Sequence, residues 1–154
     1  MGFFDGYDVA TSGMSAQRTR INVVSSNIAN AKTTNTIEGG PYKKKEVIFE
    51  EVLLSHSNKI SNNDLEKISD NNHQNGIKGV AVNSIVQSKN NPIMKYEPNH
   101  PDANEKGYVA YPNINPVVEM VDLIEAMRSY EANVATFNTH RGIDTKTLDI
   151  LAGN

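Results

Sequence analysis

The chain has 154 residues, of which 38% are hydrophobic, a small share for a self-contained core. Its 15 basic and 18 acidic residues give no bulk attraction to nucleic acid or to an anionic membrane, so we expect neither as a partner. The absence of Cys excludes a disulfide scaffold, a thiolate zinc site and a cysteine nucleophile.

The first predicted element is a helix within residues 1–31. The opening sequence MGFFDGYDVATSGM lacks the basic start and apolar run of a secretory signal, so we expect no signal-peptide cleavage. A stripe with alternating spacings of four and three residues follows, and eight of its nine positions are apolar or aromatic. Such a stripe predicts a helix that packs on other helices as in a coiled coil. Its members are Phe3, Tyr7, Ala10, Met14, Gln17, Ile21, Val24, Ile28 and Ala31.

The same segment consists largely of poor helix formers. Gly13 alone costs about 1 kcal/mol relative to Ala, and the β-branched and short polar residues around it add tenths each. A helix of this composition is marginal in isolation. We therefore expect it to need packing partners in order to fold.

Residues 32–115 predict a small, loop-rich β section. Residues 45–54 and 80–86 have the composition of strands, and residues 92–98 and 107–112 are short extended pieces. Between the two strands, residues 55–78 contain only four apolar side chains among 24, together with six Asn. That composition buries too little surface to offset chain entropy, so a mobile loop is expected there.

A second long helix is predicted after Asn115, which can cap it, and Pro116, which suits the first helical position. The charged residues within its apolar part exclude a membrane span. A weakening or break is expected near residues 141–144, where two stripe positions are charged and Gly142 also falls. The stripe runs through Met120, Leu123, Met127, Tyr130, Val134, Phe137, Arg141, Asp144, Leu148 and Leu151.

Together these elements predict an α+β fold in which the two terminal helices pair. Residues 1–31 and 116–154 would form one discontinuous coiled-coil domain, with residues 32–115 inserted between its halves. The strong apolar pattern lies in the two terminal stripes. We therefore expect other subunits to complete the core.

Candidate chemistry is sparse. The four His residues are dispersed, with no metal-ligand spacing, and His100 with Asp102 lies in a turn where an Asp side chain caps backbone amides. Glu119, Asp122 and Glu125 share a helix face, which we interpret as a solvated or subunit-facing stripe rather than a catalytic pair. Two further groups have simple structural interpretations: residues 43–45 are expected to be exposed lysines of a strand, and Arg128 and Glu131 to be intersubunit ion-pair residues. We expect no enzyme, metal site or cofactor.

Specific strings now add a resemblance. SGMSAQ at residues 12–17 and SNIANA at residues 26–31 resemble the N-terminal signature of bacterial flagellar rod, hook and hook-associated proteins. Strings at residues 38–49, 96–109 and 112–133 are similar to those of the proximal rod subunits within that family. The residues that carry the resemblance are Ser12, Gly13, Asn27, Ala29, Asn30, Gly39, Gly40, Pro41, Tyr42, His100, Pro101, Gly107, Tyr108, Arg128, Tyr130 and Asn133.

The resemblance implies a structural subunit of the flagellar basal body. Such proteins leave the cell unfolded through the flagellar type III export apparatus and polymerise helically into the periplasmic rod, which transmits motor torque to the hook. Their partners would be copies of the same chain, other proximal and distal rod proteins, and the adaptor region between the MS ring and the rod. The terminal helices would form the inner layer, where small residues such as Gly13 and Ala16 permit close helix approach.

Two other classes stay open at this point. One is a small enzyme or metal-binding domain that uses Glu97, His100 and Asp102. The other is a cytosolic export chaperone with two helical ends. Loss of function in a His100→Ala variant would favour the first, and cell fractionation separates the second from a rod subunit.

Overall fold

The computed structural model describes residues 5–54 and 77–153 and has six elements. Phe3 and residues 55–76 of the expected mobile loop lie outside the described residues. The order of elements is α1 (Asp5–Ala29), β1 (Lys45–Leu53), β2 (Lys78–Gln87), β3 (Ile93–Tyr96), β4 (Tyr108–Tyr111) and α2 (Pro116–Leu151). Two terminal helices that pack on each other, with two small antiparallel sheets between them in sequence, confirm the α+β prediction.

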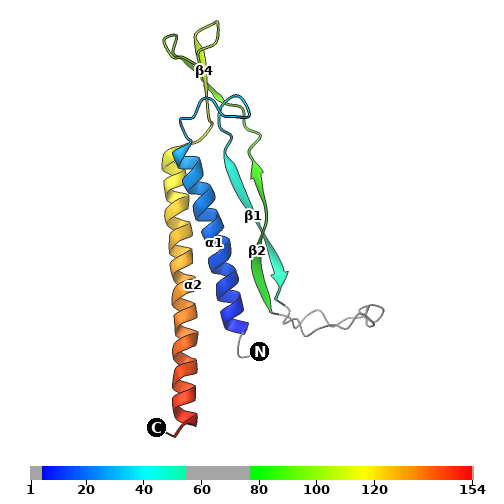
Figure 1. Cartoon of the computed structure of the whole chain (residues 1–154), viewed down its shortest axis with the longest axis vertical. Coiled ribbons are helices and arrows are strands. Elements are labelled where there is room, and N and C mark those ends of the chain that lie inside the picture. The colour runs from blue at the N-terminus through cyan, green and yellow to red at the C-terminus, as the bar shows by residue number, and fades with distance from the viewer. Residues whose placement is uncertain (1–4, 55–76, 154) are drawn as a thin grey trace, which may run out of the picture.

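The helix α1 lies between α2 and the β1–β2 hairpin, and it contacts both (Figure 1). The helices run antiparallel, and the β3–β4 hairpin lies beyond the end of the pair where α1 finishes and α2 begins (Figure 1). The chain therefore supplies the partners that the weak helix-forming sequence of α1 requires.

Each sheet has only two strands. β1 pairs with β2 from Lys45 opposite Gln87 to Leu53 opposite Lys78, with an irregularity in the register between Ile48 and Phe49. β3 pairs with β4 over four residues each. Two-stranded ribbons are marginal alone, and β1–β2 gains support from α1, on which it packs.

The start of α2 forms as predicted. Asn115 Oδ1 accepts a hydrogen bond from Val117 N at 3.0 Å, and Pro116 occupies the first turn, where its missing N–H has no intrahelical acceptor.

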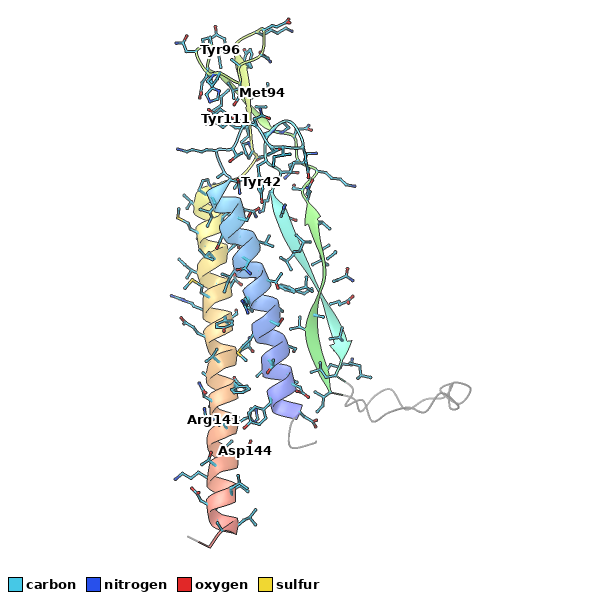
Figure 2. All side chains as sticks on the ribbon, viewed as in Figure 1. Tyr42, Met94, Tyr96, Tyr111, Arg141 and Asp144 are labelled. Atoms are coloured by element: carbon cyan, nitrogen blue, oxygen red, sulfur yellow. The ribbon has the colours of Figure 1, made fainter. Side chains whose placement is uncertain are left out.

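The break predicted near residues 141–144 is wrong, because α2 continues to Leu151. Gly142 adds only about 1 kcal/mol of helix cost, which a long hydrogen-bonded helix absorbs. The charged Asp144 is used, since its Oδ2 accepts a hydrogen bond from the Tyr7 hydroxyl at the start of α1. Figure 2 shows Arg141 and Asp144 beside that end of α1.

The two helices approach closely along lines of small and polar residues. A Cβ on Gly6 would lie 2.7 Å from the His140 ring, and one on Gly13 would lie 2.8 Å from Asn133 Oδ1. Further along, Asn27 donates a hydrogen bond to Glu119 at 2.9 Å. On both helices, the residues of closest approach directly precede large apolar residues of the predicted stripe. These stripe residues are Tyr7, Met14, Ile21 and Ile28 on α1 and Met120, Met127 and Val134 on α2.

Candidate functional site

One flank of the helix pair carries exposed apolar side chains. Each step along a helix rotates the side chain by about 100° around the helix axis. The residue that follows a contact position therefore points to one flank of the pair, and in an antiparallel pair this is the same flank for both helices. We call this flank the open flank. It is formed by Tyr7, Met14, Ile21 and Ile28 of α1 and by Met120, Met127 and Val134 of α2.

The open flank is only partly covered within the chain. Met120 and Met127 are 49% and 47% exposed, whereas the α1 residues and Val134 are half-buried. The Tyr7 ring packs edge-on against Phe137 with ring centroids 4.9 Å apart. Large contiguous patches of exposed apolar surface are typical of protein–protein interaction sites.

The apolar surface extends over the outer side of α2. Val117, Val121 and Ile124 are 52–67% exposed, and Val121 and Ile124 line a shallow groove of about 470 Å³ with Arg128, whose rim also carries Glu125. At the other end, Leu148 and Leu151 are more than 60% exposed. They lie beyond the Tyr7–Asp144 contact, and α1 begins at Asp5, only two residues before Tyr7.

The remaining members of the predicted stripe lie between the helices or near them. Ala10 and Val24 are buried. The half-buried members are Gln17, Leu123, Tyr130 and Phe137. Whether the stripe packs against other subunits stays a prediction.

A cluster of buried polar groups joins α1, β1 and α2. We call it the polar junction, and it consists of Asn27, Tyr42, Lys44, the Lys45 backbone and Glu119. Figure 2 shows Tyr42 near the end of the helix pair, beside the start of β1. Asn27 and Glu119 are each 1% exposed, so the polar atoms of these two side chains need partners inside the molecule.

Asn27 lies at the centre of the polar junction. Its Nδ2 donates to Lys45 O at 2.8 Å and to Glu119 Oε2 at 2.9 Å, while its Oδ1 accepts from Lys45 N at 2.9 Å and from the Tyr42 hydroxyl at 3.2 Å. These four bonds use the whole donor and acceptor capacity of the amide. One side chain thereby fixes the end of α1 to the first residue of β1 and to the first turn of α2.

Glu119 is held by a second charge. Lys44 Nζ lies 2.8 Å from Glu119 Oε1, and the hydrogen bond to Glu119 raises the pKa of the Lys44 ammonium above its usual 10.5, against the opposing effect of its partial burial. The first turn of a helix also favours a carboxylate. Burial of Glu119 is therefore compensated by an opposite charge, an amide and the helix terminus.

These positions correct two predictions. Glu119 is not part of a solvated or subunit-facing stripe, because it is buried, and Lys44 is not an exposed strand lysine, because its half-buried side chain pairs with Glu119. The only local signal was the place of Glu119 in the first turn after a cap, which suits a solvated carboxylate equally well. Asp122 lies 3.8 Å and Glu125 3.9 Å from Arg20 as more exposed ion pairs.

Other motif residues shape the loop after α1. Asn30 Nδ2 donates to Ser26 O at 2.9 Å, and Thr36 N donates to Gly40 O at 2.9 Å. Gly39 and Gly40 have φ values of 87° and 75°, a region that favours glycine. Pro41 follows directly and leads the chain to Tyr42. Ala29, at the end of α1, is exposed.

The residues of the alternative enzyme or metal site make turn contacts instead. His100 Nδ1 accepts from Asp102 N at 3.1 Å, Asp102 Oδ2 accepts from Thr34 at 2.6 Å, and Glu97 accepts from the Tyr111 hydroxyl at 2.8 Å. Pro101 lies between the first two, in the turns that join β3 to β4, where Gly107 has a φ of 77° and Tyr108 packs on Tyr96.

Neither of two other kinds of site appears in the part of the chain that the structure describes. Among residues 5–54 and 77–153, three or more His, Asp or Glu side chains nowhere gather closely enough to hold a metal ion. Within the same ranges, neither helix combines the length and apolar character needed to cross a membrane.

Comparison with known proteins places these features in a family. Residues 8–35 match the model of the flagella basal body rod protein family, and residues 105–150 match the C-terminal model of the flagellar basal body rod FlgEFG proteins. The first match covers most of α1 and the loop that follows, and the second covers β4 and nearly all of α2.

Full-length relatives decide the matter. The flagellar basal-body rod protein FlgC of Borreliella burgdorferi is 42% identical over 99% of this chain and 100% of its own length. The FlgC proteins of Bacillus subtilis and Escherichia coli are 40% and 35% identical, each over 97% of this chain and at least 98% of their own lengths. The chain belongs to the FlgC family.

As a member of the FlgC family, the chain is a structural subunit of the flagellar basal-body rod, and its relatives are structural rod proteins rather than enzymes. Its place is the flagellar basal body, where it assembles with other rod proteins. Two regions of the molecule can serve that role: the open flank with the outer side of α2, and the polar junction that holds the helices to the β section.

Proposed function

We propose that this FlgC-family chain builds the proximal rod by packing the open flank of its helix pair against helices of neighbouring subunits. The carrying observation is the exposed apolar surface of α2, where Met120 and Met127 remain about half exposed beside the α1 side chains of the same flank. A third helix laid on that flank would bury both rows together.

In this proposal the residue ranges 1–31 and 116–154 form the inner coiled-coil layer, and residues 32–115 face outward. The neighbours are copies of this chain, other proximal and distal rod subunits, and the adaptor region between the MS ring and the rod. The groove beside Arg128 and the exposed Leu148 and Leu151 would contact further neighbours. The assembled rod would be helical and periplasmic, and would transmit motor torque to the hook.

Export through the flagellar type III apparatus, unfolded and without cleavage of a signal peptide, completes the proposal. The poor helix formers of α1 support it, because a helix that depends on α2 and on the β1–β2 hairpin for stability unfolds together with them. The chain would then fold as it joins the growing rod.

The test uses a Met127→Asp variant produced in the flagellated source cells in place of the parent chain. A carboxylate on the open flank should stop rod assembly and motility, since burying an unpaired charge is unfavourable. The helix content of the purified variant should stay unchanged, because Met127 is exposed in the single chain.

Thr136→Asp is the matched control, since it places the same charge at an exposed position of α2 on the opposite face of the helix, nine residues or about 180° from Met127, and should leave motility intact. Normal motility of the Met127→Asp variant would contradict the assignment of the open flank. Fractionation tests the function itself: a rod subunit copurifies with basal bodies, whereas an export chaperone stays in the cytosol.

A further inference from the structure

The contacts between α1 and α2 repeat with a period of seven residues. Gly6 meets His140 and Gly13 meets Asn133, so the two contacts are seven positions apart on each helix. Fourteen residues further on, Asn27 meets Glu119. A seven-residue repeat leaves the register of two helices ambiguous, because a shift by one repeat, about 10 Å, places similar positions opposite each other.

The shape of the pair permits such a shift in one direction. α2 has 36 residues against 25 in α1, and it continues for seven residues past the Tyr7–Asp144 contact. Moving α1 by one repeat toward Leu151 would keep it facing α2 over its whole length. Gly13 would then lie opposite His140, and the exposed Leu148 would gain a neighbour, so apolar burial does not by itself select the observed register.

The polar junction does distinguish the two registers. In the shifted register Asn27 would face Ala126, which is fully buried and apolar. The Asn27 amide would lose its hydrogen bond to Glu119. The Glu119 carboxylate would then keep Lys44 but lose one of its two partners. A buried amide without its partner disfavours that register by a factor of roughly 5 to 150.

We propose that the polar junction is a register lock, in which Glu119 and Asn27 are positioning residues that select one of two heptad registers of α1 on α2. Lys44 and the Lys45 backbone extend the same lock to β1. The lock sets the height of the β1–β2 hairpin along the helix pair. It concerns the fold of a single chain, so its test is independent of the proposed packing of the rod.

Cysteine cross-linking measures the register directly, because the full chain contains no native Cys. Gly13→Cys with Asn133→Cys and His140→Ala reports the observed register, and Gly13→Cys with His140→Cys and Asn133→Ala reports the shifted one. The Ala in each pair makes room for the new Cβ at residue 13, which would otherwise lie 2.8 Å from Asn133 Oδ1 in the observed register. Each pair is placed in the parent chain and in an Asn27→Leu/Glu119→Leu background, and the yield of intramolecular disulfide is measured after mild oxidation of dilute protein. We expect the parent to favour the 13–133 cross-link at least fivefold, and the double-Leu background to give both cross-links within about threefold of each other.

Asp122→Leu is the matched control. Asp122 lies one turn after Glu119 and also pairs with α1, through Arg20, but it is more exposed, so this variant should keep the parental ratio. Circular dichroism of each variant monitors helix content. A double-Leu chain that keeps the parental ratio, a parent that forms both cross-links equally, or a double-Leu chain that loses its helices would each overturn the register lock.

Discussion

The two helices of this molecule contribute to the fold in opposite ways. α1 buries six of its 25 residues, whereas α2 buries only two of its 36, Glu119 and Ala126. Yet α2 has the richer apolar sequence, with a continuous helix that extends beyond its partner. The poorer helix former is thus enclosed by α2 and the β1–β2 hairpin, while α2 packs on α1 and leaves apolar residues uncovered.

This difference separates residues that pack the single chain from residues that stay exposed on it, although both kinds lie in the same apolar pattern of the sequence. Small residues such as Ala10, Gly13 and Ala16 let α1 approach its neighbours closely. Large ones such as Met120, Val121 and Ile124 remain available on α2. The small buried residues of α1 hold the single chain together, whereas the large exposed residues of α2 are not needed for its fold.

The largest expected effect comes from removing the buried charge that fixes α2 to α1. Glu119→Ala should lower the free energy of unfolding by about 3–5 kcal/mol, because Lys44 and Asn27 lose their shared partner inside the molecule. Thermal unfolding followed by circular dichroism measures this. Asp122→Ala, which removes a more exposed ion pair, should cost about 1 kcal/mol or less, and equal losses in the two variants would contradict the contrast.

A smaller effect is expected at alkaline pH. The hydrogen bond to Asp144 raises the pKa of Tyr7, the one to Glu97 raises that of Tyr111, and the one to Glu119 raises that of Lys44. Each folded-state pKa is above its unfolded value, so this stabilisation is complete below about pH 10 and is lost as the pH rises through the folded values. The denaturant midpoint should therefore be level from pH 8 to 9 and fall above pH 10.

Tyr7→Phe sharpens the alkaline prediction, because it removes the hydroxyl that joins the start of α1 to α2. The decline above pH 10 should become shallower in this variant. A decline as steep as that of the parent would show that Tyr7 does not contribute.

The smallest effect is expected at the uncovered end of α2. Leu148→Asp should change the free energy of unfolding of the single chain by no more than about 0.5 kcal/mol, because the side chain is already exposed. The urea midpoint measures it. A loss of 2 kcal/mol or more would mean that the end of α2 is covered within the chain.

The sequence was sufficient for the elements but not for their line of contact. The apolar stripes, the Asn115–Pro116 start and the strand composition of residues 45–54 and 80–86 all led to elements that the structure contains. Periodicity, however, weights large apolar side chains. The closest helix approach uses the adjacent line, because only small residues such as Gly6 and Gly13 leave room for it.

The polar junction was beyond the reach of sequence patterns for another reason. Asn27 and Glu119 are 92 positions apart, and neither residue has a local pattern that names its partner. The resemblance pointed to Asn27 as a motif residue, yet it gave no role to Glu119 or Lys44. Their importance follows only from the folded chain, which brings a buried amide and a buried carboxylate together with the half-buried ammonium of Lys44.

The β1–β2 hairpin gives the helix pair two unlike sides. It lies along α1 on the side where Ser12 Oγ accepts a hydrogen bond from Val80 N at 3.3 Å, so a third helix that packs on the open flank approaches α1 from another side. Any closed assembly made through the open flank would then carry every hairpin on the same side of its wall. The side of the helix pair that carries the hairpin therefore already determines, in each single chain, which face of such a tube the hairpins would cover.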